Sequence, residues 1–218
     1  RAVSSPERLA YRYLRLNGFL TNENFVVHPD SGTNQRTDAD LIGVRFCNRQ
    51  ENLIQPMDDD PLVAEANSYC NVVIAEVKRS VCALNGPWTA KEEENIQRVL
   101  SAIGCVPQGK LHEAAEALYA SGFYESELVT IRLFAFGNRR GLLRPSVTQI
   151  LFDEMLDFIY ARFQEYRNQK RSVGNWTKDG QTLARLARTS VDTLIFEQRA
   201  RIAFGLLSKT QEEGRYGE

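Results

Sequence analysis

The 218-residue chain has few residues that bind soft metals or form disulfides. Its four cysteines, Cys47, Cys70, Cys82 and Cys105, include no Cys-x-x-Cys pair, and its two histidines are not spaced to complete a zinc site with them. This usage predicts reduced thiols and a cytoplasmic protein, not a disulfide-rich or zinc-stabilised one.

The sequence also lacks a long apolar run and the glycine motifs of several enzyme classes. No apolar stretch approaches the roughly 20 residues of a membrane span, so we expect no membrane partner. No Gly-x-x-x-x-Gly-Lys-Ser/Thr, Gly-x-Gly-x-x-Gly or Gly-x-Ser-x-Gly motif is present. NTP hydrolysis and α/β-hydrolase catalysis therefore have no visible machinery.

A strong excess of charge of one sign is absent as well, because the formal net charge is -1. The charge is nevertheless unevenly distributed along the chain. Residues 1–131 hold 12 Lys and Arg against 18 Asp and Glu, whereas residues 132–218 hold 15 against 10. A uniformly basic surface is excluded, and the C-terminal part is the expected contributor if the chain binds a polyanion.

The most informative feature that is present is an apolar, β-branched run at residues 71–77, which carries Glu76 near its end and is followed by Lys78. Residues at i and i+2 of a strand point to the same face, so these two side chains emerge together. A second run, residues 37–44, carries Asp40. Paired as a hairpin, the two strands would bring Asp40 near Glu76 and Lys78. Two carboxylates beside a lysine form a hard, oxygen-rich site suited to Mg²⁺ or Mn²⁺.

This constellation, Asp40 followed by Glu76-Val77-Lys78, resembles the PD-(D/E)xK nuclease superfamily. The resemblance implies an α/β fold: an αβββαβ restriction-endonuclease-like core with a mixed four-stranded sheet. It implies a metal held by Asp40, Glu76 and the backbone carbonyl of Val77. It also implies that Asp40, Glu76 and Lys78 are catalytic, with Lys78 positioning or helping to deprotonate the attacking water. The implied reaction is phosphodiester hydrolysis, with DNA favoured over RNA.

Glu7 and Asp38 each have two interpretations. In the resembled family a glutamate of the first helix completes the metal site, which makes Glu7 a candidate ligand. Ser4-x-x-Glu7 is also a capping box, which explains the residue without a metal. Asp38 shares a strand face with Asp40 and is either a water-mediated ligand or a solvated acid at the strand entry. Asp40, Glu76 and Lys78 also have a structural alternative, in which Glu76 and Lys78 form an ion pair at the strand end and have no catalytic role.

Basic side chains near the two strand ends are candidate nucleic-acid contacts. Arg79 follows Lys78 directly, and Arg139, Arg140 and Arg144 cluster in a Gly-flanked loop. The alternative for this loop is a solvated turn. The alternative function is a catalytically inactive nuclease-fold subunit that binds or scaffolds a restriction, repair or defence complex. The lack of an obvious target-recognition module suggests a homodimer or a partner subunit.

The remaining patterns predict the order of elements along the chain. We expect a nuclease-like core over residues 1–137 and a helical C-terminal extension over 138–218. A polar insertion over 47–68 should carry an exposed acidic turn at 58–60. A capping box of Thr89 and Glu92 should open one helix. The expected helices span about 5–17, 62–66, 89–103, 110–121, 150–166 and 181–207, the last broken near Thr189-Ser190, and the expected strands span 24–28, 37–44, 71–78 and 127–136.

Overall fold

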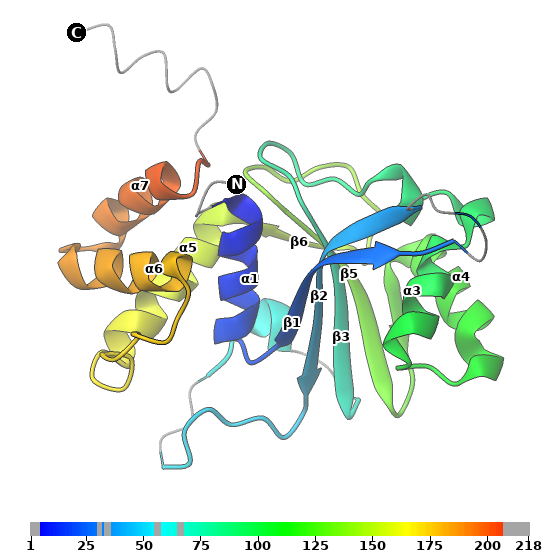
Figure 1. Ribbon diagram of the computed structural model, residues 1–218, viewed down its shortest axis with the longest axis horizontal. Helices are drawn as coiled ribbons and strands as arrows, with labels where there is room; N and C mark the ends of the chain where they lie inside the picture. Colours follow the sequence, from blue (N-terminus) through cyan, green and yellow to red (C-terminus); the bar gives the residue numbers. More distant parts are fainter. Residues whose placement is uncertain (1–4, 30–31, 33–35, 55–57, 65–67, 207–218) are drawn as a thin grey trace, which may run out of the picture.

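A computed structural model describes residues 5–29, 32, 36–54, 58–64 and 68–206. Six strands form one mixed sheet with helices on both of its faces (Figure 1). The strands are β1 Leu20–Val27, β2 Thr37–Phe46, β3 Cys70–Val77, β4 Phe123–Glu125, β5 Val129–Gly137 and β6 Thr148–Leu151. The α-helices are α1 Pro6–Leu16, α2 Pro61–Ala64, α3 Asn95–Ile103, α4 Leu111–Ser121, α5 Phe152–Glu165, α6 Lys178–Thr189 and α7 Thr193–Ala203. Short 3-10 helices are η1 Gly86–Trp88, η2 Lys91–Glu93 and η3 Gln108–Lys110.

The sheet has the order β1-β2-β3-β5-β4, and β6 pairs with β5 beside this path. β2 is antiparallel to both β1 and β3, whereas β5 is parallel to both β3 and β6. The predicted α/β class and mixed sheet are confirmed. The predicted count of four strands is wrong, because β4 and β6 also join the sheet. With three and four residues, respectively, these strands are too short to show a strand period in the sequence.

The central strand β3 contacts the helical layers on both faces of the sheet. Its side chains alternate between two buried clusters, because successive strand residues point to opposite faces. Val73, Ala75 and Val77 pack with residues of α1, α5, α6 and α7. Val72 and Ile74 pack with residues of α3 and α4. The two groups of helices lie on opposite sides of the sheet in Figure 1.

The C-terminal helices share their core with the sheet. Phe152, Leu183 and Phe196 belong to the same buried cluster as Val73 of β3. β6, which also lies beyond residue 137, is paired with β5. The boundary at residue 137 stays a prediction, but the segment that follows it contributes one strand as well as helices.

Two predicted helix boundaries are confirmed and one is wrong. α4 ends before Gly122, whose φ of +89° favours glycine. The break near Ser190 separates α6 from α7, where the Asp192 side chain accepts a hydrogen bond from the Ile195 N–H at 2.8 Å. The helix predicted from Thr89 instead begins at Asn95, after two 3-10 turns. The Thr89 hydroxyl bonds the Gly86 carbonyl, so the predicted capping box does not open the helix.

The acidic turn at residues 58–60 was predicted to be exposed, and this is wrong for two of its three residues. Asp59 accepts hydrogen bonds from Arg45 and Arg49, both at 2.7 Å, and its side chain is 4% exposed. Asp60 accepts a hydrogen bond from the Tyr13 hydroxyl at 2.7 Å. The three partners lie 10 to 47 residues away in sequence, so the local polar pattern could not show them.

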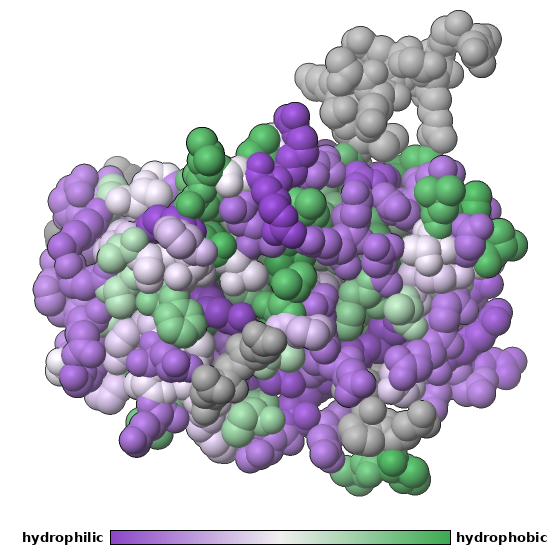
Figure 2. Space-filling view, turned by 180° about the vertical axis from the view of Figure 1, so that it is seen from behind, coloured by the Kyte–Doolittle hydropathy of each residue, from purple (hydrophilic) through white to green (hydrophobic). Residues whose placement is uncertain are grey.

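The surface is mostly polar where Figure 2 shows it. Hydrophilic side chains cover most of this face, and hydrophobic ones gather in small separate groups. Over the residues that the structure describes, none of the helices combines the length and the apolar character needed to cross a membrane.

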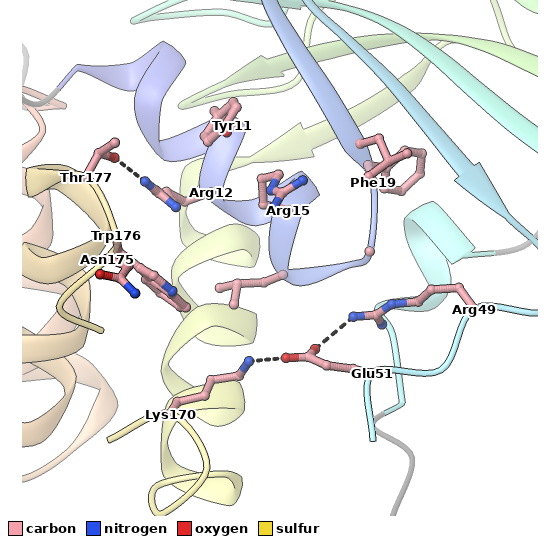
Figure 3. Close-up of a pocket in the computed structure, with 13 residues that line it drawn as sticks. Tyr11, Arg12, Arg15, Phe19, Arg49, Glu51, Lys170, Asn175, Trp176 and Thr177 are labelled. Carbon is pink, nitrogen blue, oxygen red and sulfur yellow. Dashed lines mark hydrogen bonds and ion pairs between the residues drawn. The ribbon is translucent and has the colours of Figure 1, made fainter. Parts of the chain in front are cut away.

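A buried ion-pair cluster joins the start of α6 to α1. Asp179 accepts hydrogen bonds from Arg12 Nε and from Arg8 Nη2, the latter at 3.0 Å, and its side chain is 3% exposed. Thr177 also bonds Asp179 and Arg12. Trp176 lies next to Thr177, and the Arg12 guanidinium stacks over its ring at 5.5 Å (Figure 3). A cavity of about 500 Å³ borders this cluster.

The same cavity contains a second ionic cluster on its other side. Glu51 lies between Arg49 and Lys170 and is bonded to both (Figure 3). These bonds hold the pKa of Glu51 below its ordinary value although burial opposes them. The two clusters together fasten α1, the segment after β2 and the chain between α5 and α6.

We predict that Asp179→Asn destabilises the fold in a pH-dependent manner. The guanidinium and hydroxyl partners hold the pKa of Asp179 at about 2, against 3.8 ordinarily, despite its burial. The ionised form therefore stabilises the fold by on the order of 2 kcal/mol at neutral pH. Because the folded-state pKa is the lower one, this stabilisation is full above about pH 4 and is lost as the pH falls through about 2.

Chemical denaturation of parent and variant at several pH values checks this prediction. The difference in unfolding free energy should stay constant from neutrality to about pH 4 and shrink as the pH falls further towards 2. A difference that stays constant down to about pH 2 would show that the charge of Asp179 is not what stabilises the contact.

Candidate active site

The site begins where β2 and β3 stop pairing. Their antiparallel register runs as far as Leu41 opposite Ala75, while β2 stays paired with β1 to Thr37. Beyond this point the Val77 N–H donates a hydrogen bond to Asp40 Oδ2 at 2.8 Å. A side-chain carboxylate thus replaces the ladder partner of a backbone amide. Asp40 is held at the point where the two strands separate.

Glu76 is held by two partners on the face of the sheet that α3 and α4 cover. Its residue is 1% exposed. Glu76 Oε2 accepts from Lys78 Nζ at 2.7 Å, and Oε1 accepts from Trp88 Nε1 at 2.6 Å. The Lys78 backbone N–H bonds the Phe136 carbonyl of β5 at 2.9 Å, which fixes the chain just after β3. The structure therefore brings Glu76 and Lys78 together as the strand spacing predicted.

The electrostatics of the two carboxylates are coupled. Burial raises the pKa of Asp40, and the Val77 N–H and the Lys78 charge oppose this rise, while Glu7 adds to it. Burial also raises the pKa of Glu76, and the negative charge of Asp40 raises it further against the effect of Lys78 and Trp88. The fold thus keeps two carboxylates close enough to disfavour ionisation of each other.

Glu7 lies with Asp40 on the wall of an open cleft of about 680 Å³. The N-cap of α1 is Ser5, whose hydroxyl accepts from the Arg8 N–H at 3.3 Å, so Glu7 is the second residue of the helix. Ser4, the other member of the expected capping box, lies outside the described residues. Within the described part of the chain, Glu7 has no hydrogen bond or ion pair. Its charge still acts on Asp40, which places the two acids in one electrostatic unit.

The donors at this site match a hard divalent cation in chemistry. Asp40 and Glu76 supply carboxylate oxygens, which Mg²⁺ and Mn²⁺ prefer. One oxygen of Asp40 is bound to Val77, and both oxygens of Glu76 are bound, one of them to the cation of Lys78. In the described ranges, no group of three or more His, Cys, Asp or Glu side chains is arranged to hold a metal ion. A cation would therefore be held by the carboxylates of Asp40 and Glu76 together with backbone oxygen, or by these two carboxylates and Glu7 after the Glu7 side chain has rearranged.

The predicted arginine contacts separate into different environments. Arg79 lines the cleft with Glu7 and Asp40, and its guanidinium donates to the Gly205 carbonyl at 2.7 Å. Arg139 is exposed. Arg140 donates to the Gln149 carbonyl at 2.7 Å and pairs with Glu154. Arg79 thus borders the cleft, whereas Arg139 and Arg140 are not among the described residues that line it.

Arg144 is held against the backbone of the layer formed by α3 and α4. Its guanidinium donates to the carbonyls of Trp88, at 2.9 Å, and of Leu118, at 3.1 Å, as well as to that of Tyr119. Burial lowers the pKa of Arg144. These bonds join three segments of the chain. The grouping of Arg144 with the exposed loop arginines is therefore wrong, because its side chain points inward.

Comparison with known proteins adds no family assignment. No protein-family model, curated protein or solved structure matches this chain. The residues and their geometry alone carry the functional argument.

Several residues of the site region were missed by the sequence prediction. Trp88 was not among the predicted site residues, yet its indole N–H donates a hydrogen bond to Glu76 Oε1 at 2.6 Å. Thr177, Lys178 and Asp179 line the cleft beside Glu7, from a segment about 170 residues further along the chain. No local pattern could reveal them, because their position depends on packing of α6 against α1.

We predict that Arg144→Ala and Arg139→Ala differ sharply in stability. Arg144→Ala removes the guanidinium donor of the Trp88 and Tyr119 carbonyls and one of the two donors of the Leu118 carbonyl, which should lower the unfolding free energy by roughly 1–3 kcal/mol. Arg139→Ala changes an exposed side chain in the same loop and should stay within about 0.5 kcal/mol of the parent. Urea denaturation of both variants measures the difference. Equal stabilities would contradict the inward role of Arg144.

Proposed function

We propose that this protein is a metal-dependent nuclease of the PD-(D/E)xK type that hydrolyses phosphodiester bonds, with DNA as the favoured substrate. The observation that carries the proposal is the placement of Asp40, Glu76 and Lys78 where β2 and β3 separate. An isolated strand-end ion pair would not require a second, partly buried carboxylate beside it. The element order α1, β1 to β3, α3 and α4, then β5 supports a restriction-endonuclease-like core, and the thiol usage supports a cytoplasmic protein.

The chain's own residues divide the chemistry between them. Asp40 and Glu76 would hold Mg²⁺ or Mn²⁺ together with the Val77 carbonyl, and Glu7 would supply a further oxygen. When bound, such an ion neutralises charge that grows on a scissile phosphate and promotes ionisation of a nearby water. The side chain of Lys78, 29% exposed, reaches the solvent side of Glu76. From there its ammonium can orient the attacking water or contact a phosphate oxygen.

A second candidate function is a binding or scaffold subunit that keeps the fold and does not cut. The observation in its favour is that Trp88 and Lys78 already satisfy both oxygens of Glu76. Such a subunit would act with a partner protein or as a homodimer. Incubation of the purified protein with plasmid, linear and branched DNA and with RNA, in Mg²⁺ or Mn²⁺, decides between the two. Cleavage supports the nuclease, and its absence in every mixture supports the subunit.

We expect Asp40→Asn, Glu76→Gln and Lys78→Gln each to reduce metal-dependent cleavage by on the order of 10²-fold or more, because members of one catalytic unit fail together. Asn at position 40 keeps an oxygen for the Val77 N–H, so this variant should stay folded. Initial cleavage rates and thermal unfolding are the measurements. Glu127→Gln is the control, since it removes a charge from an exposed residue outside the site and should keep most of the activity. Full activity of Asp40→Asn would refute the assignment.

The variant Glu7→Gln distinguishes the two interpretations of Glu7, as a metal ligand or as a residue that only stabilises the first helix. If Glu7 contributes to the metal site, the variant should need more Mg²⁺ for half-maximal cleavage and should lose activity. Its stability should change by no more than about 1 kcal/mol, the worth of an acid in the first helical turn. Glu113→Gln is the control, because Glu113 is a first-turn acid of α4. An unchanged Mg²⁺ titration of Glu7→Gln would assign Glu7 to helix stabilisation alone.

A further inference from the structure

A basic concave surface lies beside the cleft and is not part of the constellation described above. It has a volume of about 940 Å³ and is formed by one face of α6 and the chain just before it. Four cations, Arg171, Lys178, Arg185 and Arg188, line this α6 groove, and no Asp or Glu of the described residues lines it. Positive charge is therefore concentrated in this groove, although the formal net charge of the chain is -1.

The helical period explains why the cations gather. Lys178, Arg185 and Arg188 are spaced by seven and three residues, which places them on one face of α6. The opposite face carries Leu183 and Ala187, which are buried in the core shared with the sheet. Packing of this apolar face directs the basic face outward.

The groove cations are unneutralised within the described ranges, unlike those at the neighbouring helix contact. Lys178, Arg171 and Arg185 have no side-chain hydrogen bond or ion pair there, and Arg188 reaches only the Arg171 carbonyl at 3.5 Å. By contrast, Arg8 and Arg12 are both paired with Asp179. Like charges held close together without a counter-ion repel each other and favour an external polyanion.

The groove adjoins the cleft that Glu7 and Asp40 line. Lys178 lines both hollows. From Lys178 to Arg188 the helix advances ten residues, or about 15 Å at 1.5 Å per residue. That length corresponds to about four successive phosphates of one DNA strand, at 3.4 Å per phosphate along the axis. Guanidinium groups also match phosphate oxygens in geometry.

We propose that the α6 groove binds the phosphodiester backbone of duplex DNA on the flank of the cleft. This inference rests on the proposed nuclease function and names where its substrate is held. The groove supplies affinity without reading sequence, because its contacts are to phosphates. A DNA strand along α6 passes the acidic cleft at the Lys178 end, where Asp40 is located.

The test compares two double variants that change the net charge equally. Arg185→Gln with Arg188→Gln removes two groove cations. Lys91→Gln with Lys110→Gln removes two exposed cations outside the groove, at η2 and η3. Both pairs are placed in the Asp40→Asn protein, so that cleavage does not interfere with binding. Fluorescence anisotropy with a mixed-sequence DNA duplex, over a series of salt concentrations in the absence of divalent ions, gives the affinity and its salt slope. Thermal unfolding verifies that all proteins remain folded.

We expect the groove variant to bind the duplex roughly tenfold more weakly and to lose about two units of salt slope, since each phosphate contact contributes about 0.9. The control variant should lose much less of either quantity. Equal losses in the two variants, or no DNA binding by the Asp40→Asn protein, would overturn the proposal. The proposal would also be overturned if the groove substitutions weakened binding of an RNA duplex or of polyglutamate but left DNA binding unchanged.

The outcome is separable from that of the nuclease proposal. If the parent cleaves nothing but the groove variant still loses DNA affinity selectively, the groove stands and the nuclease proposal fails. If cleavage depends on Asp40 but the groove variant binds DNA as the control does, the groove proposal alone fails.

Discussion

The carboxylate of Asp179 is the contact on which the placement of the whole cleft depends. It receives the guanidinium groups of Arg8 and Arg12 and so docks the start of α6 against α1. A buried charge with matched donors is strongly directional, because any other arrangement leaves an ion unpaired at low dielectric. The contact sets Lys178 at the cleft margin next to Glu7. Hydrophobic packing alone, which is not directional, would not select this orientation.

A second constraint operates where the sheet opens. Strand pairing ends between β2 and β3, and the amide of Val77 then needs a new acceptor, which Asp40 provides. The same opening leaves Glu76 facing Trp88 and Lys78 instead of an apolar partner. The elevated pKa values of Asp40 and Glu76 reflect the free energy of holding two acids together under partial burial. Under the proposed function, a bound cation would relieve this repulsion between the two acids.

Charge is divided between the two sides of the proposed substrate path. Among the described residues, the cleft wall has four acidic side chains beside three basic ones, whereas the charged side chains that line the adjoining α6 groove are all basic. This division suits a nucleic acid, because carboxylates repel phosphates until a cation binds while the groove attracts them throughout. Arg144 shows that net charge by segment is an incomplete guide to binding surfaces, since its guanidinium holds backbone carbonyls of the protein itself.

The sequence by itself determined the α/β class, the central strands and the pairing of Glu76 with Lys78, because these follow from the local two-residue strand period and from the hairpin. It also determined the helix ends at Gly122 and near Ser190. It did not reveal β4 and β6, which pair with β5, the burial of the Asp59 side chain, or the bonds of Arg144 to backbone carbonyls. Only the tertiary structure decided that Trp88 meets Glu76 and that α6 borders the cleft. Such contacts join segments up to about 170 residues apart, and they form only when packing of the core brings those segments together.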